Sequence, residues 1–158
     1  MDNHLLRGAS MGISALLCLA TGLAACGSSS SASSKANDTL LVKQAWTGFF
    51  SGKTSAADKI KLLQNGQQFS QIINEATGLA ISTTSSATVS NVVINSPTSA
   101  TVTYSINLGG TPALENQTGT AVKVGGQWLV GDSSFCALLA LEGQSVSACS
   151  STTGSSAG

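Results

Sequence analysis

The first part of the chain carries apolar side chains at the spacing of amphipathic helices. Apolar positions recur every three or four residues over 38–50, which predicts a helix there. Ser55 and Asp58 have the spacing of a capping box, with Asp in place of the more common Glu, and predict a short helix over 55–63. A third helix is expected over 67–77.

From residue 79 onward the pattern changes to one in which apolar and polar side chains alternate. Thr, Ser and Val become dense, and the segment 100–108 places Tyr104 and its apolar neighbours on one face, with Ser, Thr and Asn on the other. Gly125 and Gly126 suit a two-residue hairpin turn. We therefore expect strands over 87–95, 100–108, 119–124 and 127–130, followed by a helix that is capped by Asp132 or Ser133 and ends at Gly143.

This order of elements predicts the α+β fold class. Helices come first, a mostly antiparallel meander of strands follows, and one helix ends the fold. Such an arrangement packs its helices on one face of the sheet.

The N-terminus has the pattern of a secretory signal peptide. Residues 1–7 contain Arg7, and residues 8–25 carry no charge and are largely apolar. This apolar stretch is short for a transmembrane helix, which needs about 20 apolar residues. A buried core helix or a membrane anchor is the alternative interpretation.

The end of this stretch predicts a lipid anchor. Leu23-Ala24-Ala25-Cys26 resembles the lipobox of bacterial lipoproteins, in which the thiol is alkylated with diacylglycerol and cleavage leaves the Cys as the first residue. Cys18 is the competing position, but the branched Leu17 directly before it fits such a site poorly. The mature protein would then be tethered to a membrane through lipid on Cys26 without spanning it.

These signals divide the chain into four parts. Residues 1–25 are the predicted signal peptide, and residues 26–37 are a lipidated Cys followed by a Ser-rich linker. The folded domain is expected over 38–149, and a Ser/Thr/Gly tail over 150–158 is expected to be disordered.

Two cysteines remain in the predicted domain, and they predict a structural disulfide. Cys18 leaves with the signal peptide and Cys26 is lipidated, so Cys136 and Cys149 are left in an extracytoplasmic compartment, where disulfides persist. The alternative is a redox-active pair, but these residues lack the Cys-X-X-Cys spacing and a nearby cation that would lower a thiol pKa. The pair would staple the last helix to the domain.

Composition argues against catalysis and against nucleic acid as a partner. Charged residues make up 9% of the 158-residue chain, and seven basic residues balance seven acidic ones, so no basic patch can form. His4 and Arg7, the sole His and the sole Arg, lie in the predicted signal peptide. The mature chain therefore lacks the groups for a Ser-His-Asp triad, an imidazole metal site or a bidentate phosphate clamp. We expect no catalytic residue, no metal and no cofactor.

Three segments resemble one known family. LLQNGQQF (62–69), ATVTYSINLGGTP (100–112) and TGTAVKVGGQWLVGDSSFCALLAL (118–141) are similar to the actinobacterial low-molecular-weight antigen family, over about residues 38–142. The resemblance implies a fold like nuclear transport factor 2, in which a curved sheet wraps helices into a cone. It also implies export from an actinobacterium-like organism and no established enzymatic activity.

Two functions remain open for an extracytoplasmic, lipid-anchored domain of this kind. The first is an interaction or structural module of the cell envelope, whose Ser/Thr-rich strand faces bind an envelope protein or form a homodimer. The second is a carrier that holds a hydrophobic small molecule or lipid in the cone. Its candidate pocket lining is Trp46, Tyr104 and Trp128, which would otherwise fill the core.

Overall fold

The structure is a computed structural model and describes residues 29–152 of the chain. The predicted signal peptide, the lipidation residue Cys26 and the last six residues of the predicted tail lie outside the described residues.

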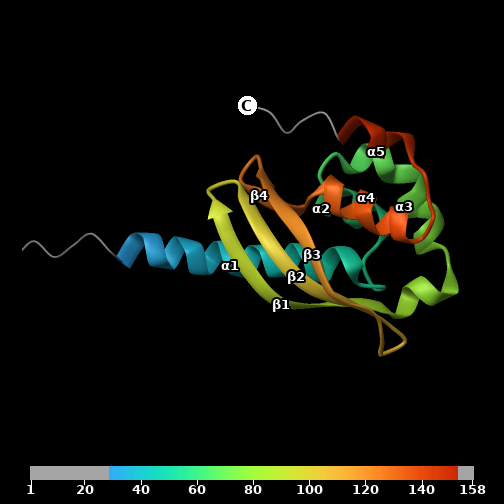
Figure 1. The fold of residues 1–158 in the computed structure, drawn as a ribbon, viewed down its shortest axis with the longest axis horizontal. Coiled ribbons are helices and arrows are strands. Elements are labelled where there is room, and N and C mark those ends of the chain that lie inside the picture. The colour runs from blue at the N-terminus through green and yellow to red at the C-terminus, as the bar shows by residue number, and fades with distance from the viewer. Residues whose placement is uncertain (1–28, 153–158) are drawn as a thin grey trace, which may run out of the picture.

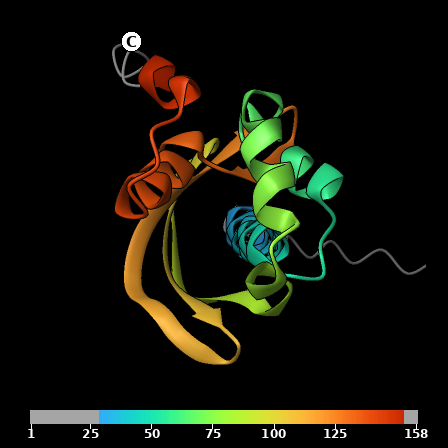
Figure 2. The ribbon, with the colours of Figure 1, turned by 90° about the vertical axis from the view of Figure 1, so that its right-hand side faces the viewer.

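The described residues form an α+β fold in which helices pack against a four-stranded antiparallel open sheet, as the sequence predicts (Figure 1). The strand order β1-β2-β3-β4 follows the chain. In Figure 2 the sheet curves around α1, which runs through its concave side. The elements are α1 (Ser29–Phe50), α2 (Ala56–Leu62), the 3-10 turn η1 (Gly66–Phe69), α3 (Ser70–Thr77), the 3-10 turn η2 (Ala80–Thr84), β1 (Ser85–Ser96), β2 (Ser99–Leu108), β3 (Thr111–Val124), β4 (Gln127–Val130), α4 (Asp132–Leu141) and α5 (Ser147–Thr152).

The start of the first helix differs from the prediction. α1 begins at Ser29 and includes most of the segment 26–37 that the sequence analysis assigned to a flexible linker. The segment contains no Pro, and from Ser29 it contains no Gly, so nothing in it stops a helix from extending outward from the packed turns. Side chains 32–37 are exposed, and these turns project beyond the sheet in Figure 1. At the other end, α5 extends to Thr152 in the predicted tail.

Strand β3 is longer than predicted. The sequence analysis expected it over 119–124, but it begins at Thr111, directly after a turn in which Gly109 and Gly110 both have positive φ. Pro112, which follows the Gly109-Gly110 turn closely, pairs with Asn107 of β2, and β3 continues past irregularities around Ser105. Pairing with a neighbouring strand thus outweighs local propensity here.

The core lies between α1 and the concave face of the sheet. Its largest fully buried side chains include Trp46 from α1 and Tyr104 from β2. Gly119 of β3 lies under Trp46, because a Cβ at that position would be 2.3 Å from the indole Cη2. The indole therefore packs directly on the backbone of β3.

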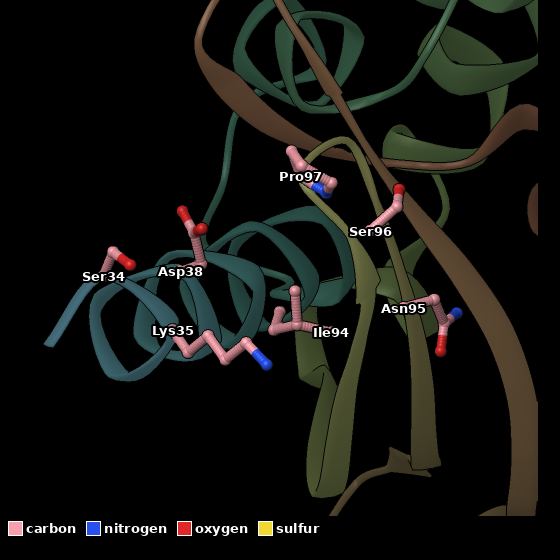
Figure 3. Close-up of a pocket in the computed structure, with 7 residues that line it drawn as sticks. All are labelled: Ser34, Lys35, Asp38, Ile94, Asn95, Ser96 and Pro97. Carbon is pink, nitrogen blue, oxygen red and sulfur yellow. The ribbon is translucent and has the colours of Figure 1, made fainter. Parts of the chain in front are cut away.

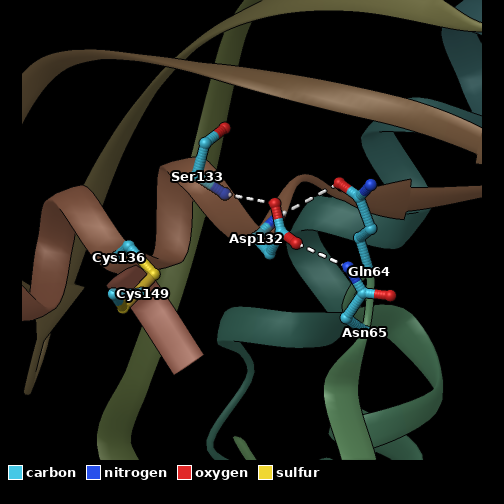
Figure 4. The surroundings of a disulfide bond; sticks show 6 residues. All are labelled: Gln64, Asn65, Asp132, Ser133, Cys136 and Cys149. Atoms are coloured by element: carbon cyan, nitrogen blue, oxygen red, sulfur yellow. Dashed lines mark hydrogen bonds between the residues drawn. A yellow bond between two sulfur atoms is a disulfide. The ribbon is translucent and has the colours of Figure 1, made fainter. Parts of the chain in front are cut away.

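The disulfide between Cys136 and Cys149 is confirmed and joins α4 to α5 (Figure 4). The two Cα atoms are 5.5 Å apart, within the usual range for a disulfide. The bond fastens the last helix of the described chain to the helix that follows the sheet.

Candidate functional site

The three aromatic residues proposed as a pocket lining do not form one site. The Trp46 and Tyr104 rings lie 4.3 Å apart between centroids and are both buried in the core, with Phe50 stacked on Tyr104 at 5.7 Å. Trp128 is also buried, but its indole takes part in a separate polar cluster between α1 and the β3–β4 hairpin.

Burial changes the chemistry of the Trp46–Tyr104 pair. Desolvation raises the pKa of Tyr104 to about 12, so its hydroxyl is neutral at physiological pH. The Nε1 of Trp46 is buried and has no hydrogen-bond partner among the described residues. A buried unpaired N–H costs about 1–3 kcal/mol, which the large apolar area of this ring offsets.

The polar cluster is built on Asp38, which receives two hydrogen bonds on one carboxylate oxygen. Lys123 Nζ and Trp128 Nε1 each donate to Asp38 Oδ1 over 2.8 Å. The ammonium of Lys123 also lies 5.5 Å from the centroid of the Trp128 ring, a cation–π distance. The hydrogen bonds from Lys123 and Trp128 lower the pKa of Asp38. Asp38 is the first residue of the helix predicted over 38–50, whereas it lies within α1 and fastens that helix to the hairpin.

Two shallow hollows lie on either side of this part of α1. One has a volume of about 330 Å³ and is lined by Lys35 and Asp38 of α1 and by residues 94–97, at the end of β1 and the start of the turn to β2 (Figure 3). The other has a volume of about 320 Å³ and is lined by Leu41, Gln44, Ala45, Leu62, Gly126, Gln127 and Trp128. Of the three proposed pocket residues, Trp128 lines the second hollow, whereas Trp46 and Tyr104 line neither of the two.

A second polar cluster surrounds the buried Asp132 at the start of α4 (Figure 4). Its Oδ2 accepts a hydrogen bond from Asn65 Nδ2 over 2.7 Å, and its Oδ1 accepts one from the backbone N–H of Ser133 over 2.7 Å. Asn65 has φ 53°, in the left-handed region, and precedes η1, from where its amide reaches the carboxylate of Asp132. Asp132 was expected to be a cap or a surface residue. It instead joins two segments that are distant in the sequence, and Gly131 occupies the N-cap position without a side-chain bond.

The remaining charged groups with resolved contacts also serve the fold. Ser55 and Asp58 form the predicted cap of α2, where the Ser55 hydroxyl accepts from the Asp58 N–H and donates to its carboxylate. Lys59 Nζ donates to the carbonyl of Phe49 at the end of α1, and burial lowers the pKa of Lys59. A cation at this position suits the negative end of the helix dipole.

Residues 29–152 contain no group of three or more His, Cys, Asp or Glu side chains placed to hold a metal ion. Within the same residues, no helix has both the length and the apolar character needed to cross a membrane.

Sequence reasoning alone missed the partners of Asp38 and Asp132. Lys123 and Trp128 lie 85 and 90 residues after Asp38, and Asn65 lies 67 residues before Asp132. The available signal was that Asp38 and Asn65 lie at the boundaries of predicted helices, a position that local capping explains equally well.

Comparison with known proteins gives one match. A family model described as the low molecular weight antigen MTB12, C-terminal domain, matches residues 37–146, which is most of the described fold. This confirms the resemblance noted from residues 62–69, 100–112 and 118–141. No curated protein and no solved structure matches the chain.

Proposed function

Because the chain belongs to the family of the low molecular weight antigen MTB12, through its C-terminal domain, we propose that it is a lipid-anchored protein of the cell envelope whose domain is a non-catalytic interaction or structural module. The family supports an antigen-like, non-catalytic role in an extracellular or envelope protein. The lipid anchor and the interaction role extend beyond what the family shows.

The observation that carries the non-catalytic proposal is that both partly or fully buried acids are held by structural bonds. Asp38 is held by Lys123 and Trp128, and Asp132 by Asn65 and Ser133. A general base needs a carboxylate aimed at a substrate site. One oxygen of Asp38 and both oxygens of Asp132 instead accept hydrogen bonds from the fold itself.

The lipid anchor is proposed from the sequence Leu23-Ala24-Ala25-Cys26. α1 begins at Ser29, soon after this cysteine, and its side chains 32–37 are exposed. Residues 29–37, at 1.5 Å per residue, would make a helical spacer of roughly 14 Å between the anchor and the sheet. The spacer carries a single charged residue, Lys35, whose cationic side chain suits an anionic membrane surface.

A second candidate function is a carrier for a hydrophobic small molecule. The hollow of about 320 Å³ beside Trp128 favours it, because Leu41, Ala45 and Leu62 give that hollow apolar walls. Its volume is at the low end of the range for ligand sites, which is about 300–1,000 Å³. A ligand held there would contact α1, α2 and the β3–β4 hairpin.

The anchor is tested by Cys26→Ser in the full chain, produced in a bacterium that has a lipoprotein pathway. We expect the unchanged chain in the detergent-extracted membrane fraction and the C26S chain outside it. Cys18→Ser is the matched control and should leave the distribution unchanged. Membrane association of C26S equal to that of the unchanged chain would contradict the proposal.

A further inference from the structure

The two edges of the sheet differ in what lies beside them. The edge formed by β4 is covered, since Leu63 forms a parallel bridge with Val130 and the N–H of Gln64 donates to the Val130 carbonyl. The edge formed by β1 is open. Within the described part of the chain, the backbone of 87–94 has no partner other than β2.

Backbone groups of β1 that point away from β2 can be identified from one hydrogen bond. The N–H of Gly52 donates to the carbonyl of Ser85 over 2.8 Å, so the Ser85 carbonyl faces away from β2. Strand backbone groups alternate in direction, and Ala87 and Val89 therefore face outward as well. The register of the β1–β2 pair skips Ser90 as a bulge, which shifts the alternation by one residue and makes Val92 and Ile94 the outward-facing residues that follow.

The four outward-facing residues of β1 also carry apolar side chains, which form a row along the open edge of the sheet. Their Cα partners on β2 are Ile106, Tyr104, Val102 and Ala100, all of them buried. Ala87, Val89, Val92 and Ile94 pack against this core but are only partly buried. Another strand added at this edge would cover them and satisfy their outward N–H and C=O groups.

The bulge restricts which strand can pair along this edge. A regular strand matches the alternation of β1 on one side of Ser90 only, because the bulge reverses the alternation on the other side. A second β1 in antiparallel orientation carries the same irregularity at the same place. A two-fold axis between Ser90 and Asn91 brings Val89 opposite Val92 of the second copy and Ala87 opposite its Ile94. Apolar residues then face apolar residues throughout.

Charge also permits this pairing. β1 contains no charged residue and no Pro, so two copies meet without like-charge repulsion and without a missing N–H. Val93 adds an exposed apolar side chain on the outer face of the same strand.

We propose that the chain forms a two-fold dimer in which β1 pairs antiparallel with β1 of a second copy, centred on the Ser90 bulge. The two sheets become one continuous sheet of eight strands, since each copy contributes the four strands of its own. This inference goes beyond the proposed function and does not depend on the lipid anchor, because the pairing involves described residues alone.

Asn91→Lys tests the pairing, because Asn91 is exposed and lies next to the proposed axis. Thr118→Lys is the matched control. Thr118 is exposed on β3 and lies level with Asn91 across the sheet, through the pairs Asn91↔Thr103 and Thr103↔Thr118. It adds the same charge two strand spacings away, about 10 Å from the edge.

The mass of the full chain in mild detergent is measured by sedimentation over a range of concentrations. We expect a dimer for the unchanged chain and for T118K, and a dissociation constant raised by about tenfold or more for N91K and for N91D. An equimolar mixture of N91K and N91D should recover the dimer, which also shows that both variants fold. A monomeric unchanged chain, an N91K dimer as stable as that of the unchanged chain, equal weakening by T118K, or a mixture that stays monomeric would each overturn the proposal.

Discussion

The carboxylate of Asp38 and the indole N–H of Trp128 are joined by a 2.8 Å hydrogen bond across 90 residues of sequence. This bond fastens the central helix α1 to the short strand β4, and Lys123 donates to the same oxygen. The helix that the sheet curves around is thus held by a polar bond as well as by the apolar contacts of Trp46.

Trp128→Phe is expected to lower the free energy of unfolding by about 2 kcal/mol, because it removes the N–H donor and part of a buried ring. A double-mutant cycle with Asp38→Asn, measured by denaturant unfolding, should give a coupling energy of favourable sign between the two residues. Additive single effects would contradict the assigned bond.

The pH dependence of the free energy of unfolding gives a second test of the hydrogen bonds to Asp38. Hydrogen bonds from Lys123 and Trp128 depress the pKa of Asp38 below its ordinary value of 3.8. The stabilisation is therefore complete above about pH 3.8 and is lost as the pH falls through the lower folded-state pKa. The difference in stability between the unchanged chain and D38N should shrink in that acidic range and stay constant near neutrality.

Much of the fold is predictable because its signals are local. The cap formed by Ser55 and Asp58 and the turn at Gly125 and Gly126 follow from spacing and residue type, and the structure contains both. Gly119 is different, since the sequence predicts it only as the first residue of a strand, whereas it lies inside β3 and makes room for Trp46. Its role depends on a residue that only the folded chain brings near.

Gly119→Ala is expected to destabilise the fold by about 2 kcal/mol through overpacking. The added Cβ would be 2.3 Å from Trp46 Cη2 and 3.0 Å from Ser134 Oγ. Gly78→Ala is the control, because its nearest contact would be 3.4 Å away and its φ is helical, so its effect should stay within about 0.5 kcal/mol. Thermal or denaturant unfolding compares the two, and equal effects would contradict the packing of Trp46 on Gly119.

The Cys136–Cys149 bond should stabilise the domain by about 3 kcal/mol, the chain-entropy value for a loop of this length. The double variant Cys136→Ala, Cys149→Ala tests this by denaturant unfolding of the oxidised protein. Reductant should lower the midpoint of the unchanged chain to that of the variant and leave the variant unaffected. A midpoint in the unchanged chain that reductant does not move would contradict a stabilising disulfide.

The Tyr104 hydroxyl should ionise at a higher pH than an exposed tyrosine, and its ionisation should destabilise the fold. Burial raises its pKa from the ordinary 10.0 to about 12, so its contribution to stability is complete below pH 10 and is lost as the pH rises toward 12. Tyrosinate absorbance reports this residue alone, because the chain has one Tyr. Ionisation near pH 10 in the folded protein would contradict its burial, and Tyr104→Phe should remove this part of the alkaline loss of stability.

The two proposed functions differ in what the hollow beside Trp128 contains. A carrier would retain a small molecule beside Trp128 and Leu41, whereas an interaction module would leave that hollow to solvent. Both proposed functions assume the same anchor at Cys26, so the anchor is the claim on which the envelope account rests.

The most direct test is a native mass spectrum of the protein extracted gently from its own membrane. The account predicts a chain that begins at Cys26 and carries covalent diacylglycerol, without a further adduct that is lost on denaturation. An adduct of that kind would favour the carrier function. A chain that retains the residues before Cys26, or an unmodified Cys26 thiol, would contradict the central claim.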